Sequence, residues 1–218
     1  MKLVIGNKNY SSWSLRPWIL MRQFDLPFEE IRVRINHPET KSEILRYSPS
    51  GRVPVLLDGG VTVWDSLAIA EYLAEKFPER GLWPREAPIR AHARSVACEM
   101  HSGFSALRQS MPMNCRADAP GVGRNADCLA DIARIQAIWR DCRTRHAGKG
   151  PFLYGAFSVA DAMFAPVVIR FTGYRVDLEP LAQAYCETLW SLPTLQEWVA
   201  SGREESYRIE AYESLLPL

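Results

Sequence analysis

The pattern of apolar and polar positions changes near residue 80, and the two sides of this change predict different architectures. Before it, the periodicity predicts strands and helices in alternation, over residues 3–5 (strand), 14–24 (helix), 28–35 (strand), 40–46 (short helix), 55–57 and 61–64 (strands) and 66–77 (helix). This order predicts a small mixed sheet with helices on its faces. Because proline fits a helix only near its first turn, Pro17 indicates that the first helix begins close to Ser14.

The second part of the chain has the longer periods of helices. Apolar residues recur every three or four positions from Ile89 to Met111 and from Leu129 to Cys142. Further helices are predicted over 158–172, 178–190 and 194–200, a loop over 112–124 and an irregular tail from Tyr207. We therefore expect an α/β domain over 1–79, a linker over 80–85 and an all-helical domain over 86–218.

Composition narrows the classes of function. The 218 residues are 47% hydrophobic and 23% charged, and 26 Lys and Arg against 25 Asp and Glu give a net charge of +1. This balance argues against a nucleic-acid partner. The first apolar run is too short for a signal peptide or a membrane span, so we expect a cytoplasmic protein with no membrane partner. Five cysteines without a Cys-x-x-Cys pair are expected to be free thiols.

Two neighbouring segments predict a site for a peptide-like ligand. In Gly51–Leu57, Pro54 cannot donate to a sheet, so it stands at the start of a strand and leaves the backbone before it extended and free. A few residues later, Asp65 and Ser66 begin a helix whose first N–H groups are unpaired and carry partial positive charge. Backbone groups beside an anion site suit a peptide with a carboxylate at one end.

A run of serines, Ser11-Ser12-Trp13-Ser14, precedes the first predicted helix. A hydroxyl there lies near the positive end of the helix and can donate to an anion. If that anion were a thiolate, each unit of lowered thiol pKa would correspond to about 1.4 kcal/mol of stabilisation. The alternative is that a serine here is only the N-cap of the helix, and the spacing leaves both interpretations open.

These motifs resemble those of the cytosolic glutathione transferases, and the resemblance spans both predicted domains. Ser11–Arg16 is similar to the serine motif of the zeta, phi, tau and theta classes, in which one serine holds the glutathione thiolate. The resemblance implies this role for Ser11, with Ser12 as the second candidate. Zeta enzymes typically have Ser-Ser-Cys-Ser-Trp-Arg here. Trp13 stands at their cysteine position, which argues against maleylacetoacetate isomerase identity and against omega- or beta-type cysteine chemistry.

The resemblance also implies how glutathione is bound. Ser48–Leu56 resembles the family's Asn-Pro-x-Gly-Lys-Val-Pro-x-Leu, which implies a cis Val53–Pro54 bond and a Val53 backbone paired with the cysteinyl unit. Asp65 and Ser66 stand where the family has Glu-Ser or Gln-Ser, for the γ-glutamyl amino group and carboxylate; N-capping is the alternative for Asp65. The remaining candidates for glutathione binding are Lys41 and Arg52, for the glycine carboxylate or as solvated surface charges, and Pro54 and Trp13.

Three further predictions concern the second domain. Ser158 and Asp161 resemble the motif that opens a buried helix of the family, and we assign them to a capping box and to folding. For the electrophile pocket, the resemblance favours residues of the first long helix, with core packing as the alternative: Met100, Phe104, Leu107 and Met111. Cys98 and His101 share a helix face without further ligands at zinc spacing, so no metal is expected.

Taken together, the resemblance implies a thioredoxin-like α/β domain followed by an all-α domain, the glutathione transferase fold. The expected function is glutathione-dependent transfer to, or isomerisation of, a small electrophile, without a metal, by a homodimer. Two alternatives stay open: a non-catalytic binding or partner module, and a glutathione-dependent isomerase or peroxidase of the same fold. The sequence does not identify the electrophile.

Overall fold

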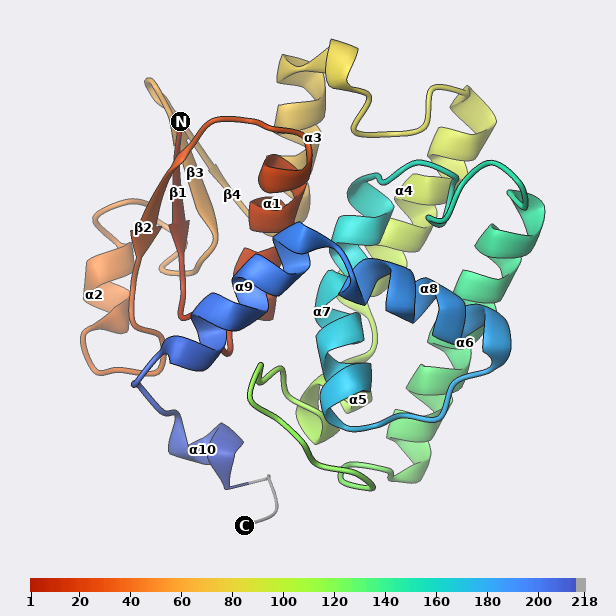
Figure 1. The fold of residues 1–218 in the computed structure, drawn as a ribbon. Coiled ribbons are helices and arrows are strands. Elements are labelled where there is room, and N and C mark those ends of the chain that lie inside the picture. The colour runs from red at the N-terminus through yellow and green to blue at the C-terminus, as the bar shows by residue number, and fades with distance from the viewer. Residues whose placement is uncertain (215–218) are drawn as a thin grey trace.

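The computed structural model describes residues 1–214, and its four strands all come from the first 64 of them (Figure 1). They form one mixed sheet in the order β2-β1-β3-β4, from β1 (Lys2–Ile5), β2 (Glu29–Arg32), β3 (Val55–Asp58) and β4 (Val61–Trp64). β1 runs parallel to β2, with Val4 opposite Ile31, and antiparallel to β3, with Val4 opposite Val55. The predicted β-α-β-α-β-β-α order is confirmed.

Helices make up most of the remaining chain. They are α1 (Ser12–Gln23), α2 (Thr40–Ile44), α3 (Ser66–Lys76), the 3-10 turn η1 (Pro78–Arg80), α4 (Ala87–Ser102), α5 (Ser105–Ser110), α6 (Ala126–Arg145), α7 (Val159–Gly173), α8 (Pro180–Trp190), α9 (Pro193–Glu204) and α10 (Glu210–Glu213). The tail expected to be irregular thus contains one short helix, and its residues 215–218 lie outside the described residues. Among the helices described here, none is long and apolar enough to cross a membrane.

Helix α1 lies between the sheet and the helical part, in contact with α3, α7 and α9. It begins at Ser12, so Pro17 lies inside the helix, and the expectation that this proline falls in a first turn beginning near Ser14 is wrong. A proline inside a helix costs about 3 kcal/mol. Burial on both sides offsets this cost, as where the rings of Trp18 and Trp198 meet edge-on with centroids 5.2 Å apart.

The long apolar period from Ile89 to Met111 predicted burial correctly, but it spans two helices. α4 ends at Ser102, and Phe104 then takes a left-handed backbone conformation with φ of 61° before α5 begins. Gly103 is required at the break, because a Cβ there would lie 2.8 Å from the carbonyl oxygen of Glu99. In α6 the apolar pattern overstates burial, since Leu129 is 47% exposed.

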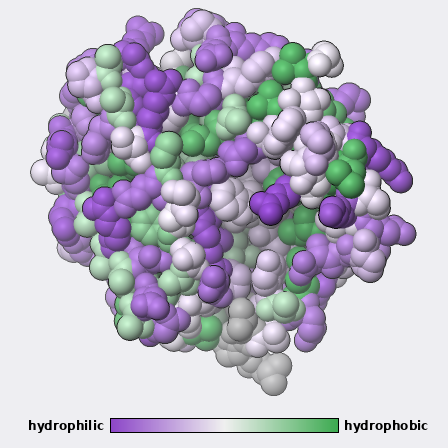
Figure 2. Space-filling view, turned by 180° about the vertical axis from the view of Figure 1, so that it is seen from behind, coloured by the Kyte–Doolittle hydropathy of each residue, from purple (hydrophilic) through white to green (hydrophobic). Residues whose placement is uncertain are grey.

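One hydrophobic core runs through both parts of the chain, from Ile5 and Trp18 to Trp139 and Phe164. A smaller cluster containing Val4 and Ile44 covers the other face of the sheet beneath α2. Figure 2 shows the molecule from behind, where hydrophilic residues are spread over the surface between separate hydrophobic patches. Because the larger core is continuous, the division of the chain at residues 80–85 stays a prediction.

Asp161 organises the start of α7, as the capping motif predicts. Its buried carboxylate accepts the N–H and the hydroxyl of Ser158, each at 2.9 Å, together with the N–H of Leu153 at 3.0 Å and the hydroxyl of Tyr185 at 2.9 Å. Burial raises the pKa of Asp161 to about 6, while the four donors favour the charged form. The carboxylate therefore ties the first turn of α7 to the preceding loop and to α8.

Replacing Asp161 with alanine is expected to lower the free energy of unfolding by about 3 kcal/mol or more, because buried donors lose their acceptor. Urea unfolding followed by circular dichroism measures the change. The matched control is Asp177→Ala, which removes an exposed carboxylate that pairs with Arg124. Equal losses in the two variants would contradict the assigned role of Asp161.

Candidate active site

Ser11 and Ser12 lie at the start of α1 and line a cavity of about 440 Å³. Ser11 stands at the N-cap position, but its side chain makes no capping hydrogen bond. Instead its hydroxyl donates to Oγ of Ser14 at 2.7 Å, and the same Oγ accepts the N–H of Gly6 at 3.0 Å. The hydroxyl of Ser12 makes no hydrogen bond with any residue in the described range 1–214. Capping therefore does not account for these serines.

The absence of a side chain at Gly6 allows this arrangement. A Cβ at that position would lie 2.7 Å from Cγ2 of Ile35 and 3.1 Å from Oγ of Ser11. Any larger residue would therefore push apart the end of β1 and the serine run. The close approach keeps Ser11 and Ser14 beside the Gly6 N–H.

A second cavity, of about 470 Å³, adjoins the first and is lined by Trp13, Ser50, Arg52, Val53, Pro54, Trp64, Asp65 and Ser66. Trp13, Arg52 and Val53 line both cavities. The Val53–Pro54 bond is cis, as the resemblance implies. Within residues 1–214 the Val53 backbone has no hydrogen-bond partner, so it can pair with an extended ligand.

Asp65 and Ser66 line this second cavity at the start of α3. Asp65 has φ of 76° and caps α3, its carboxylate accepting the N–H of Leu67 at 2.8 Å. A non-glycine residue in this conformation is uncommon and clusters at ligand sites. Ser66 is 1% exposed, and its buried hydroxyl has no partner among the described residues. An unpaired buried hydroxyl at a helix start is suited to an anionic ligand group.

The two basic candidates differ in position. Arg52 is exposed and lines both cavities. Lys41 is exposed on α2, with its stem beside Gly51, and lines neither of the two cavities. The structure therefore brings Arg52 to the ligand region and leaves Lys41 at its edge.

The structure does not bring the four residues expected for the electrophile pocket to the cavity. Met100, Phe104, Leu107 and Met111 are at most 7% exposed and belong to the core, where α4 packs on α7 and α5 packs on α6. The helical part instead lines the cavity of Ser11 through Arg108, Pro112, Met113, Arg170 and Tyr212. Core packing, the alternative to an electrophile pocket for these four residues, is therefore what their apolar spacing reports.

Three arginines concentrate positive charge around this cavity. Arg16 and Arg170 are buried, Arg108 is partly buried, and no carboxylate of the described chain lies within 4.0 Å of them. Burial, reinforced by the charge of Arg108, lowers the pKa of Arg170 to about 9; burial also lowers the pKa of Arg16 and of Arg108. The guanidinium carbons of Arg16 and Arg108 lie 4.3 and 4.8 Å from the ring centroid of Trp13.

Sequence reasoning missed Arg108 and Arg170. The available signal was Arg170 itself, a charge within the otherwise apolar run 162–171 of a buried helix. Buried cations of this kind are retained where they are paired or where a ligand supplies the missing charge.

His101, on α4, lies behind two residues that line the second cavity, Asp65 and Trp13. Its Nε2 lies 3.2 Å from a carboxylate oxygen of Asp65, and its ring meets Trp13 edge-on at 5.2 Å. Burial lowers the pKa of His101, as do the charges of Arg16 and Arg108, while Asp65 opposes the shift. The lowered pKa favours the neutral form of His101 beside Asp65. In the part of the chain that the structure describes, no group of three His, Cys, Asp or Glu side chains could hold a metal ion.

Comparisons with known proteins agree with this geometry. A family model described as the glutathione S-transferase N-terminal domain matches residues 10–76. A zeta-class glutathione S-transferase of Euphorbia esula is 32% identical over 94% of this chain and 93% of its own. A probable maleylacetoacetate isomerase of Caenorhabditis elegans is 26% identical over 84% and 85%. A match to a dichloromethane dehalogenase of Methylorubrum extorquens, 48% identical, covers 29% of this chain and 23% of that one.

Solved structures share the fold. A bacterial maleyl pyruvate isomerase of the zeta class has a TM-score of 0.72 at 24% identity, covering 95% of this chain and 100% of its own. A glutathione transferase homolog from Burkholderia with bound glutathione has a TM-score of 0.71 at 22% identity, covering 94% of this chain and 98% of its own.

A serine-lined helix start, a cis-proline strand and a helical part over them define a glutathione-dependent enzyme of the transferase class. The chain belongs to the glutathione S-transferase family, and the Euphorbia esula relative that matches nearly its full length is named a zeta-class enzyme. Trp13 therefore does not exclude zeta-class membership.

The lowered pKa of His101 predicts a pH-dependent stability. The folded protein binds this proton less readily than the unfolded chain, so the stability that neutral His101 contributes is present above the ordinary pKa of 6.5 and is lost as the pH falls. We expect His101→Gln to be less acid-sensitive than wild type when urea unfolding is compared at neutral and mildly acidic pH. The control is the same change at the exposed His37. Equal acid sensitivity in wild type and His101→Gln would contradict the prediction.

Proposed function

We propose that this chain binds glutathione along the second cavity and holds its thiolate at Ser11, for attack on a small electrophile in the first cavity. The observation that carries the proposal is that the two cavities meet at Trp13, Arg52 and Val53. A tripeptide bound against Val53 would thus extend from the unpaired Ser66 hydroxyl toward the serines of α1.

Each unit of the tripeptide has a partner of suitable chemistry. The hydroxyl and N–H of Ser66, at the positive end of α3, would bind the γ-glutamyl carboxylate. Asp65 would accept the γ-glutamyl amino group, and the cysteinyl backbone would add to Val53 beside Pro54 as an extra strand does. Arg52 would face the glycine carboxylate, with Lys41 as the more distant candidate. Trp13 would cover the thiol from the side of the helical part.

Thiolate stabilisation at Ser11 requires its proton to turn from Ser14 toward the sulfur. Hydroxyl groups can reverse such a bond: Ser14 would donate to Ser11 and keep the Gly6 N–H as its own donor. A hydrogen bond to a charged acceptor contributes about 1.5–3 kcal/mol, enough to lower the thiol pKa by about one to two units. Ser12, whose hydroxyl is free within the described chain, is the second candidate for this contact.

A second candidate function is isomerisation of an anionic substrate. Arg108 and Arg170 line the electrophile cavity and make no ion pair with a carboxylate of the described residues, so an anion would be attracted there. Two relatives are named for isomerases of maleyl compounds, and a maleyl group is an unsaturated carboxylate. The thiolate would add to the double bond and leave again after rotation, returning glutathione unchanged.

The proposal also covers the domain boundaries, the oligomeric state and the alternative functions. We infer a glutathione-binding domain over residues 1–79, a linker over 80–85 and a helical domain over 86–218. A homodimer in the cytoplasm is supported by the family membership. The non-catalytic binding module is less favoured, because Ser11 and Ser12 both line the cavity. A peroxidase based on a protein thiol is less favoured too, because no cysteine of the described residues lines either cavity.

Ser11→Ala is expected to lower kcat about 10- to 100-fold, the equivalent of one hydrogen bond to a charged group, while glutathione still binds. Stopped-flow absorbance of the thiolate, turnover with a chlorodinitrobenzene and calorimetry with glutathione measure the three quantities. Ser12→Ala is the matched control, with a smaller loss. A larger loss in Ser12→Ala would transfer the role to Ser12, and failure of wild type to bind glutathione at millimolar levels would contradict the proposed function.

For the electrophile, we expect a preference for negative charge that depends on arginine. Wild type should use a chloronitrobenzoate better than the chloronitrobenzamide with the same ring and leaving group. In Arg170→Gln, kcat/KM for the benzoate should fall about tenfold more than kcat/KM for the amide, since one charged hydrogen bond is lost. Arg108→Gln provides a second test. Equal losses for the two substrates would argue against an anionic substrate.

A further inference from the structure

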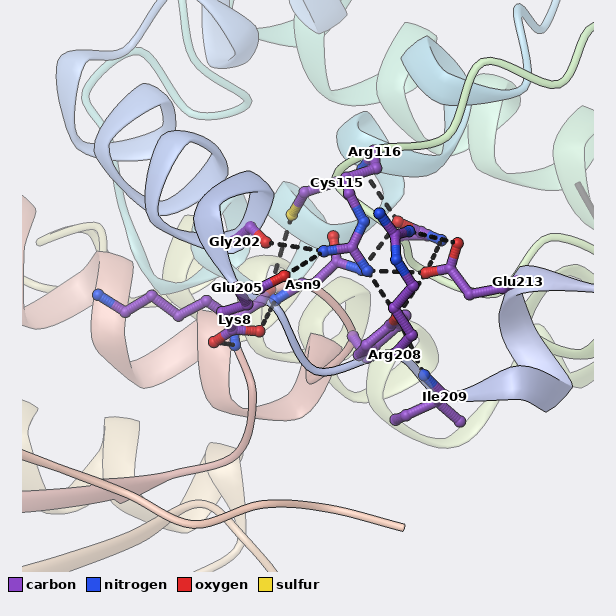
Figure 3. Close-up of polar contacts among 11 residues, drawn as sticks. Lys8, Asn9, Cys115, Arg116, Gly202, Glu205, Arg208, Ile209 and Glu213 are labelled. Atoms are coloured by element: carbon purple, nitrogen blue, oxygen red, sulfur yellow. Dashed lines mark hydrogen bonds and ion pairs between the residues drawn. The ribbon is translucent and has the colours of Figure 1, made fainter.

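The segment from Glu205 to Glu213, which we call the latch segment, lies across the loop that leads into α1 (Figure 3). At its beginning, the carboxylate of Glu205 accepts the backbone N–H groups of Lys8 and Asn9 at 2.7 and 3.1 Å. Further along, the N–H of Ile209 donates to the hydroxyl of Tyr10 at 3.1 Å. The latch segment thus holds the three residues that directly precede Ser11.

Glu213 closes this arrangement at the other end of the segment. Its carboxylate accepts hydrogen bonds from the hydroxyl of Tyr10, from Nδ2 of Asn114 at 3.2 Å, from Nη2 of Arg116 at 2.7 Å and from Nη1 of Arg208 at 3.2 Å. Arg116 also donates to the Tyr10 hydroxyl at 2.6 Å, so Tyr10, Arg116 and Glu213 contact one another in a ring. Figure 3 shows Arg116 and Arg208 both directed at Glu213.

These contacts are shielded from solvent, which separates them from ordinary surface ion pairs. The side chains of Arg116 and Glu213 are 14% and 18% exposed. Burial alone would raise the pKa of Glu213, but the donated hydrogen bonds of Tyr10 and Arg116 lower it overall. The other terminal nitrogen of Arg116, Nη1, donates to the carbonyl oxygen of Glu205 at 2.9 Å. The cluster is therefore charged and geometrically constrained.

Tyr212, next to Glu213, faces the active-site cavity. It lines the same cavity as Ser11, and its ring centroid lies 5.6 Å from that of Tyr10, which also lines it. One side of the cavity therefore consists of a residue that comes more than 190 positions after Ser11 in the chain. Its neighbour Glu213 contacts Tyr10 and Arg116, so this end of the latch segment is tied to the cavity lining next to Tyr212.

We propose that Glu213 is a positioning residue that closes the latch segment over the loop before Ser11 and thereby makes Tyr212 a wall of the electrophile cavity. The proposal rests on the proposed function, since it assigns that cavity to the electrophile. Glu213 acts through Tyr10 and Tyr212 and touches no reacting atom. The wall restricts where the electrophile lies relative to the thiolate, so it affects electrophile binding more than glutathione binding.

The test compares Glu213→Gln with Glu210→Gln, a change at an exposed carboxylate of the same short helix. Trypsin cleavage after the exposed Arg208 reports opening of the latch segment. We expect cleavage of Glu213→Gln to be about fivefold faster than that of wild type, because a neutral amide lacks the negative charge that pairs with Arg116 and Arg208. We expect its KM for the electrophile to rise about threefold at unchanged glutathione affinity. Glu210→Gln should resemble wild type, and Glu213→Asp, which keeps the charge, should recover part of the protection.

Tyr212→Ala tests the wall separately and keeps the proposal testable if Glu213→Gln does not fold. It should raise the KM for the electrophile without faster trypsin cleavage, because the contacts of Glu213 remain. Equal cleavage of Glu213→Gln and Glu210→Gln would overturn the latch, and an unchanged electrophile KM in Tyr212→Ala would overturn the wall. If wild type does not bind glutathione in calorimetry, the proposed function fails, whereas the trypsin rates still decide whether Glu213 closes the segment.

Discussion

The packing of α1 between the sheet and helices α7 and α9 determines where every other functional group can lie. Nine of the twelve residues of α1 are buried, so the helix cannot shift without disturbing both halves of the core. Its first turn shares the two cavities of the site with Val53, two residues before β3, and with Ser66, the first residue of α3. Because the sheet fixes these positions relative to one another, three segments distant in sequence share a single pair of cavities. The site is therefore a consequence of the fold's central interface.

Arg108 and Arg170, near that interface, make no ion pair with a carboxylate of the described residues, and backbone carbonyls compensate for their charge. Arg108 donates to the carbonyl oxygens of Met100 and Gly103 at the end of α4, and Arg170 donates to the carbonyl of Met111 at the end of α5. The C-terminal end of a helix carries partial negative charge, so its carbonyl groups stabilise a cation without an acidic side chain. The arginines thus keep a positive potential that reaches an incoming ligand, whereas carboxylate partners would cancel it.

The sequence was informative wherever local chemistry determines local structure. Proline at position 54, the start of α3 at Asp65 and the pair Ser158–Asp161 each have a local physical requirement, and each appears where the pattern placed it. Burial along α4 and α5 was also predictable, because apolar spacing reports the side that avoids water. The break at Gly103 was not, since it depends on the contact of the turn with Glu99. The positions of Arg170 and Tyr212 in the cavity lining could not be predicted either, because both residues reach the cavity through tertiary packing.

The proline inside α1 has a consequence for the mobility of the site. The ring at position 17 lacks the N–H that would bond to the carbonyl of Trp13, so the opening turn is not joined to the rest of the helix by a complete ladder. The turn is held instead by two hydrogen bonds to Oγ of Ser14, one from the N–H of Gly6 and one from the hydroxyl of Ser11. The turn that carries the serines is therefore joined to the later turns by one backbone hydrogen bond fewer than an uninterrupted helix would have. In amide hydrogen exchange this would separate a fast-exchanging first turn from a slow-exchanging remainder of the same helix.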